Sequence, residues 1–89
     1  MFKKKEIFFK GEVYKLCRLT AYIEPVKRLH DIEEHLISHN AEIIDIRISK
    51  CKGIYRRYNY SILFYATGRD ISAISAKTDS GIRFIVGLA

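Results

Sequence analysis

Residues 25–49 read PVKRLHDIEEHLISHNAEIIDIRIS, and the spacing of apolar residues changes within this stretch in a way that decides the fold. In its first half, apolar residues recur at intervals of three and four, which is typical of an amphipathic helix. They are Val26, Leu29, Ile32 and Leu36. Pro25 is expected to open this helix and Asn40 to end it.

From Glu42 onward the period changes to two, which predicts a β-strand over 42–49. Successive side chains of a strand point to opposite faces. Strict alternation therefore divides the strand into Ile44, Ile46 and Ile48 on one face and Ile43, Asp45 and Arg47 on the other.

Strand-like segments lie on both sides of this pair. Residues 5–10 and 13–24 are rich in β-prone residues, and Gly11-Glu12 between them predicts a hairpin turn. Residues 55–66 and 82–88 predict two further strands, with a short helix between them that Asp70 would cap. The expected core faces of the longer strands are Cys17, Leu19, Ala21 and Ile23, and Tyr58, Tyr60, Ile62, Phe64 and Ala66.

The predicted fold class is α+β, with a small antiparallel sheet that carries one main helix, and a short second helix, on one face. An N-terminal β-hairpin arm precedes a split βαβ, or ferredoxin-like, order of elements. The serines and threonines after Asp70 are poor helix formers, so a long loop into an edge strand is the alternative to the second helix. With 89 residues and no linker or repeat, residues 1–89 are expected to form a single domain.

Composition narrows the class of protein further. Hydrophobic residues make up 48% of the chain and charged residues 29%, which is typical of a globular protein. No apolar run is long enough to cross a bilayer. Cys17 and Cys51 form no C-x-x-C pair and are interpreted as free thiols. We therefore expect a cytoplasmic protein, of a cell or of an infected host, without membrane binding.

The net charge of +6 is unevenly distributed along the chain. Residues 24–45 contain six acidic residues, whereas residues 46–69 contain no acidic residue and six basic ones, interleaved with tyrosines. Cations bind phosphates, and exposed aromatic rings stack on unpaired bases, so this stretch favours single-stranded RNA as the partner. The open sheet face is expected to show Tyr14, Arg18, Tyr22, Arg47, Arg57, Asn59, Tyr65 and Arg83.

These patterns predict a non-catalytic, sequence-tolerant nucleic-acid-binding protein, with RNA favoured. Binding is expected through a basic loop at 50–57 and the N-terminal lysines, with Tyr55 as a stacking residue. The predicted binding residues are Lys3, Lys4, Lys5, Lys10, Arg47, Lys50, Lys52, Tyr55, Arg56 and Arg57. Aliphatic residues on the open face also predict a homodimer that pairs through the sheet face or a sheet edge. They are Leu16, Ile43, Leu63 and Ile85.

Two other functions stay open at this point. A small, lysine- and isoleucine-rich chain without an active site is also typical of phage accessory proteins that inhibit a host enzyme or a toxin–antitoxin nuclease. A small metal-dependent nuclease is the third interpretation, because Asp31, His35 and His39 are spaced by four on the predicted helix. No fourth ligand or hydrolytic base accompanies them, so we expect no enzyme activity, no bound metal and no cofactor.

Overall fold

The computed structural model describes residues 4–25, 27–76 and 83–89, and of Ile23 it describes the backbone. Five strands and two helices follow one another in that part of the chain. They are β1 (Glu6–Phe9), β2 (Glu12–Pro25), α1 (Arg28–Ser38), β3 (Glu42–Lys50), β4 (Arg57–Thr67), α2 (Gly68–Ser75) and β5 (Phe84–Leu88). The predicted α+β class is confirmed, and the second helix is present.

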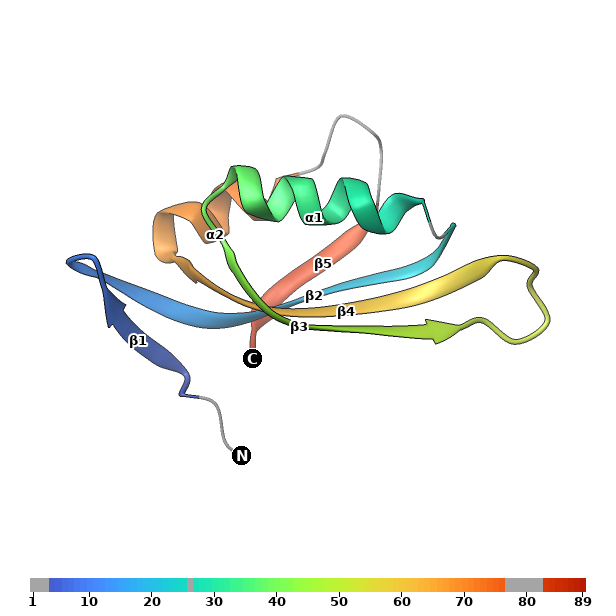
Figure 1. The fold of residues 1–89 in the computed structure, drawn as a ribbon, viewed down its shortest axis with the longest axis horizontal. Helices are drawn as coiled ribbons and strands as arrows, with labels where there is room; N and C mark the ends of the chain where they lie inside the picture. The colour runs from blue at the N-terminus through green and yellow to red at the C-terminus, as the bar shows by residue number, and fades with distance from the viewer. Residues whose placement is uncertain (1–3, 26, 77–82) are drawn as a thin grey trace.

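All strand pairs that the structure describes are antiparallel, and they form one sheet around the long strand β2. One edge of β2 pairs with β4, and β4 in turn pairs with β3. The other edge of β2 is shared, because its first residues pair with β1 and the stretch from Cys17 to Ala21 pairs with β5. The hairpin arm and the last strand thus lie end to end along the same side of β2 (Figure 1).

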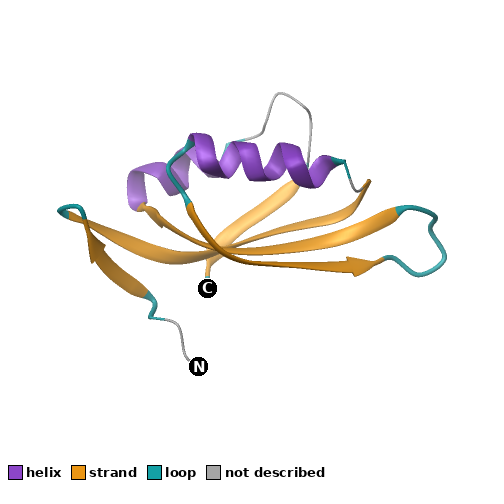
Figure 2. Ribbon diagram, in the orientation of Figure 1, coloured by secondary structure: helices purple, strands orange, loops and turns teal. Residues whose placement is uncertain are grey.

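Both helices lie on one face of the sheet, and neither of these described helices covers the opposite face (Figure 2). The core lies between the helices and the sheet. β4 contributes its even-numbered residues, as predicted, and β2 contributes Cys17, Leu19 and Ala21. Ile32 and Leu36 of α1 and Ile74 of α2 close the core from the other side.

The start of α1 differs from the expectation. Pro25 is the last residue of β2, opposite Arg57, and α1 begins three residues later at Arg28. The Tyr60 hydroxyl donates a hydrogen bond to the Pro25 carbonyl at 3.0 Å, which ties this end of β2 to β4. Lys27 takes the N-cap position without a side-chain hydrogen bond. At the other end Asn40 has a φ of 60°, which fits its predicted role as the helix stop.

The predicted faces of β3 were wrong at one residue. A β-bulge between Ile43 and Asp45 inserts an extra residue against β4, so strict alternation fails there. Ile43 consequently packs against the core together with Ile46, and it does not lie on the open face with Asp45.

The cap of α2 and the turn between β1 and β2 are each formed by other residues than predicted. Thr67, and not Asp70, is the N-cap of α2: its hydroxyl accepts a hydrogen bond from the Asp70 N–H and donates one to the Asp70 carboxylate. Asp70 is the third residue of the helix, so Thr67 makes the N-cap half of a capping box, while the Asp70 carboxylate bonds the Thr67 hydroxyl. The turn between β1 and β2 is Lys10-Gly11, one residue earlier than predicted, and both residues have positive φ angles, 51° and 76°.

Within the described ranges, neither helix has the length and apolar character that crossing a membrane requires.

Candidate nucleic-acid interface

The odd-numbered residues of β4 lie on the face of the sheet opposite the helices, which we call the open face. Antiparallel register then places residues of the neighbouring strands on the same face. Arg18 of β2 lies opposite Leu63, and Arg47 of β3 lies opposite Ser61. The open face therefore carries one arginine from the strand on each side of β4, as alternation predicts.

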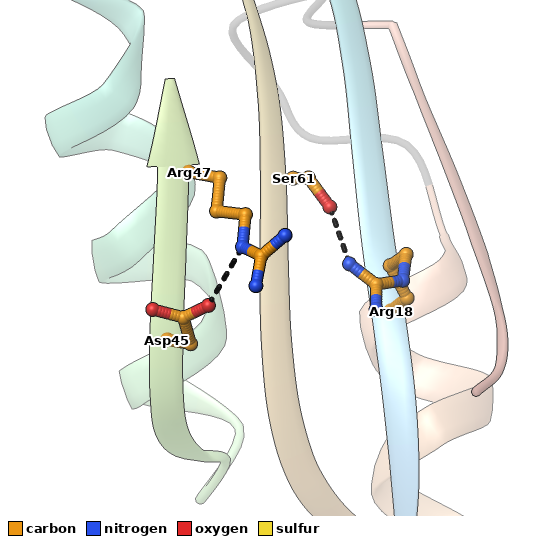
Figure 3. A network of polar contacts seen from close by, with 4 residues as sticks. All are labelled: Arg18, Asp45, Arg47 and Ser61. Carbon is orange, nitrogen blue, oxygen red and sulfur yellow. Dashed lines mark hydrogen bonds and ion pairs between the residues drawn. The ribbon is translucent and has the colours of Figure 1, made fainter. Parts of the chain in front are cut away.

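The two arginines are held differently: the Arg47 guanidinium extends over β4, whereas that of Arg18 lies over β2 and directs one nitrogen toward Ser61 of β4 (Figure 3). Nη1 of Arg18 donates a hydrogen bond to the Ser61 hydroxyl at 2.7 Å. Nε of Arg47 lies 3.2 Å from a carboxylate oxygen of Asp45, while 79% of the Arg47 side chain is exposed. A guanidinium group offers five N–H donors in a rigid fork that matches a phosphate group. The pair can therefore accept one anion from both sides of Ser61.

A hollow of about 690 Å³ lies farther along the sheet, at the end near Arg57. Tyr22, Arg57 and Arg83 line it together with Glu24, Phe84 and Ile85. The Tyr22 ring is 56% exposed. Cations and an accessible ring thus lie beside each other, which is the combination that binds a phosphate and a neighbouring unpaired base.

The β3–β4 loop, residues 51–56, continues this surface beyond the sheet. The Cys51 N–H donates to the Arg57 carbonyl at 2.9 Å, which closes the base of the loop. Tyr55 is 80% exposed, and the Arg56 guanidinium lies over its ring, 5.0 Å from the centroid. Lys50 and Lys52 are exposed as well. The loop residues of the predicted site are therefore close in space and available to a ligand.

The N-terminal lysines lie elsewhere. In Figure 1, β1, which follows these lysines in the chain, lies on the side of the sheet away from the helices. The Tyr65 hydroxyl donates a hydrogen bond to the Lys4 carbonyl, which holds this segment beside the open face. Lys5 precedes β1, and its carbonyl accepts a hydrogen bond from the Leu16 N–H at 2.8 Å. Lys3 lies outside the described residues.

Lys10 lies apart from both the β3–β4 loop and the N-terminal lysines. It lies in the β1–β2 turn with its ammonium 5.2 Å from the centroid of the Phe9 ring. It also lines a second hollow, of about 550 Å³, that Ile37 of α1 borders. The structure thus divides the predicted binding residues into three groups and one separate residue. The groups are the β3–β4 loop with Arg57, the open face with Arg47, and the segment Lys4-Lys5. Lys10 lies apart from all three.

Two of the tyrosines expected on the open face are not available for stacking. Tyr14 is buried, with its ring edge against Phe9, and the hydroxyl of half-buried Tyr65 is taken up by Lys4. Leu16 and Leu63 are only 7% and 8% exposed. Together with the inward position of Ile43, this leaves Ile85, which is 67% exposed, as the accessible one of the four aliphatic residues expected on the open face. Arg18 and Ser61 were missing from the predicted binding set, although alternation placed Arg18 on this face.

The histidines of α1 have structural partners. Nε2 of His35 lies 2.8 Å from the Ile74 carbonyl, so this side chain joins α1 to α2. Nδ1 of His39 lies 2.8 Å from the His35 carbonyl, and Asp31 pairs with Arg28. His30 and Glu34 lie 3.0 Å apart on the exposed side of α1. In the parts of the chain that the structure describes, no three His, Cys, Asp or Glu side chains come together as metal ligands would.

The two cysteines lie in different surroundings. Cys17 belongs to the core, and burial raises the pKa of its thiol. Cys51 is half-buried at the base of the β3–β4 loop, where its thiol donates to the Asn59 side-chain oxygen at 3.5 Å. Neither thiol is disulfide-bonded, as predicted.

Comparison with known protein families, with curated proteins and with solved structures finds no match to this chain, so its residues and their geometry are what bear on its function.

Proposed function

We propose that this protein is a non-catalytic nucleic-acid-binding protein, with RNA favoured, that binds through the open face and the β3–β4 loop. The observation that carries the proposal is the position of Arg18, Arg47 and Arg57 on one helix-free face. Residues 46–69, which include β4 and the loop, contain no acidic residue to neutralise them. Two carboxylates from outside that stretch lie near these arginines: Asp45 faces Arg47, and Glu24 lines the hollow that Arg57 also lines.

Single-stranded RNA fits this surface better than a duplex does. The exposed rings of Tyr22 and Tyr55 lie next to arginines, and a base can stack on them only when it is unpaired. Stacking accepts every base, so binding would tolerate sequence. Because the remaining contacts are to phosphates, affinity would fall steeply with salt concentration.

Within this surface, Arg18 and Arg47 would bind one phosphate between them. Ser61 already accepts a hydrogen bond from Arg18, which orients that guanidinium toward β4. Arg47 points toward the same strand with most of its side chain exposed. A phosphate there would replace Asp45 as the partner of Arg47.

The fold supports this use of the sheet. We interpret the strand order β5–β2–β4–β3, with α1 between β2 and β3 and α2 between β4 and β5, as the split βαβ, ferredoxin-like arrangement. β1 would be an additional arm on it. In such an arrangement the helices cover one face and leave the other accessible to a ligand.

Charge reversal in the loop tests the proposal. The variant Arg56→Glu with Arg57→Glu is compared with Lys27→Glu with Arg28→Glu, which makes the same charge change at the start of α1. Binding to a random single-stranded RNA and to a DNA duplex is measured by fluorescence anisotropy across a salt series. We expect the loop variant to lose at least about tenfold in affinity for RNA and the control variant to lose far less.

Circular dichroism shows whether both variants remain folded. Equal losses in the two variants would mean that net charge, and not this surface, determines binding. Wild-type affinity in the loop variant, or no binding of RNA by the wild-type protein at low salt, would contradict the proposal.

A protein target is the second candidate, and the outer side of α1 favours it. Ile37 is 62% exposed on this helix, which also carries Asp31, Glu33 and Glu34. An apolar side chain among carboxylates suits a partner with a basic rim, such as a host enzyme or a toxin–antitoxin nuclease. A pull-down with and without nuclease treatment separates the candidates: a protein that stays bound after nuclease treatment supports direct docking, and one that is lost supports RNA as the bridge.

A further inference from the structure

β3 is an edge strand of the sheet. Over the described residues it pairs with β4 alone, so its outer edge presents backbone N–H and C=O groups that no other described strand pairs. Two isoleucines of this strand are also exposed, Ile44 by 37% and Ile48 by 49%. An edge of this kind accepts a further strand unless other features oppose it.

The sequence of β3 is complementary to itself. When two copies run antiparallel with Ile46 opposite Ile46, Asp45 of each copy faces Arg47 of the other, and Ile44 faces Ile48. Opposite residues of an antiparallel pair point to the same face. Asp45 and Arg47 lie on the open face, whereas Ile46 and Ile48 lie on the helix side. The charged pairs and the central Ile46 pair would therefore form on separate faces.

The charges also select this register over its neighbours. Moving one strand by two residues keeps the faces matched but places either Arg47 opposite Arg47 or Asp45 opposite Asp45. Like charges directly opposite each other are destabilising, and opposite charges are stabilising. A shift by a single residue would place apolar side chains opposite charged ones. Only the register centred on Ile46 satisfies both conditions.

We propose that two copies of this chain pair through their β3 edges in that register. The two-fold axis passes between the two Ile46 residues, perpendicular to the sheet, so the two five-stranded sheets join into one. Both open faces then lie on the same side of the dimer, with Asp45 and Arg47 of each copy forming a ring of alternating charges. The inference does not depend on the proposed RNA binding.

The bulge, which leaves Ile44 without a partner on β4, limits regular pairing to the residues that follow it, from Asp45 onward. Bulges restrict edge pairing in general, so the dimer is expected to dissociate on dilution. Its detection therefore requires a concentration series that extends to about 1 mM.

The test uses three variants of the full chain: Asp45→Arg, Arg47→Asp, and both substitutions together. Each single variant places like charges opposite each other twice, whereas the double variant restores both pairs with their signs exchanged. Mass is measured by sedimentation equilibrium after nuclease treatment, so that RNA cannot hold two copies together. We expect the wild-type mass to rise from 10.4 kDa toward twice that value. We also expect each single variant to dissociate at least about tenfold more readily and the double variant to return to within a few-fold of the wild type.

Circular dichroism confirms that each variant is folded, and Ile48→Lys supplies a block that leaves Asp45 and Arg47 in place. A monomeric Ile48→Lys variant supports pairing through this edge. A wild-type protein that stays at 10.4 kDa throughout the series would overturn the proposal. A double variant that is no more dimeric than the single ones would overturn it as well.

Discussion

The phenol of Tyr60 shows how one buried polar group holds two strand ends together. Its side chain is only 1% exposed, and its hydroxyl donates to the carbonyl of Pro25, the last residue of β2. Burial raises the pKa of Tyr60 above its usual value of 10.0, and the nearby Tyr58 and Glu24 act in the same direction. The hydroxyl therefore stays protonated and stays a donor over the whole neutral range.

This raised pKa predicts a loss of stability at alkaline pH. Above pH 10.0 the unfolded chain gives up the Tyr60 proton while the folded protein retains it, so the unfolded state binds fewer protons. The free energy of unfolding then falls as pH rises from the unfolded value through the folded one. Cys17 adds a loss of the same sign from its usual pKa of 9.0 upward, because burial raises its pKa too.

The variant Tyr60→Phe separates the contribution of Tyr60 to this loss of stability at alkaline pH from that of Cys17. We expect the variant to be less stable by about 1 kcal/mol near neutral pH, because it loses the hydrogen bond to Pro25. Between about pH 9 and about pH 11 it should lose less stability than the wild type. Urea denaturation at several pH values measures both effects. A variant whose stability falls as steeply as that of the wild type would show that Tyr60 does not titrate in this range.

At the scale of elements, β4 and α2 differ in how far their sequences determine them. β4 alternates without interruption, so its core face was predicted residue by residue. β3 has an equally regular sequence, yet its bulge turns Ile43 toward the core. The local sequence pattern does not predict this bulge. A bulge depends on how β3 meets β4 and the helices, which is a property of packing and not of the strand alone.

The second helix was expected to be weak, and the N-cap that Thr67 provides helps to explain why it forms. The sequence TGRD at 67–70 places a threonine three residues before an aspartate, which is the pattern of a capping box. Ile74 then adds a fully buried side chain to the core. These two contributions offset the low helix propensity of the serines. The sequence predicted a helix cap here, but the prediction assigned it to Asp70, whereas Thr67 is the N-cap residue.

Thr67→Ala tests the contribution of this cap. We expect the free energy of unfolding to fall by about 1 kcal/mol, because the Asp70 N–H loses its acceptor at the helix start. Thr67→Ser should recover most of that loss, since it keeps the hydroxyl. Ser72→Ala serves as the control, because the Ser72 hydroxyl only bonds back to the Gly68 carbonyl within the helix, and its removal should change little. Urea denaturation of the three variants measures the differences. Equal effects of Thr67→Ala and Ser72→Ala would contradict the role of the cap.

For the whole molecule, the charge distribution was visible in the sequence, but its arrangement in space was not. The acid-free stretch 46–69 supplies most of β4 and the loop, so the loop residues were predicted as one group and lie together. The N-terminal lysines could not be placed, because their position depends on the Tyr65–Lys4 hydrogen bond between residues far apart in the chain. That bond puts Lys4 beside the open face, at the opposite end of β4 from the loop.

This placement predicts how binding depends on the length of the ligand. Arg57 and Tyr65 are eight residues apart on β4, a span of about 26 Å. A single strand of about 4 nucleotides would cover only the loop and its neighbouring arginine, whereas one of about 12 would run past Arg18 and Arg47 to Lys4. The longer strand should therefore show the steeper dependence of affinity on salt, by about 0.7 in logarithmic slope for each further phosphate contact.

Removing the two lysines tests which ligand reaches them. In the variant Lys4→Gln with Lys5→Gln, we expect the salt slope for the longer strand to decrease by up to about 1.4 and that for the shorter strand to stay the same. Lys10→Gln is the control: Lys10 borders the hollow beside Ile37 and lies outside this path, so its loss should leave both slopes unchanged. Fluorescence anisotropy over a salt series provides the slopes. If Lys10→Gln flattens the slope as much as the double variant does, the strand follows the hairpin turn and not the open face, and the path along β4 is wrong.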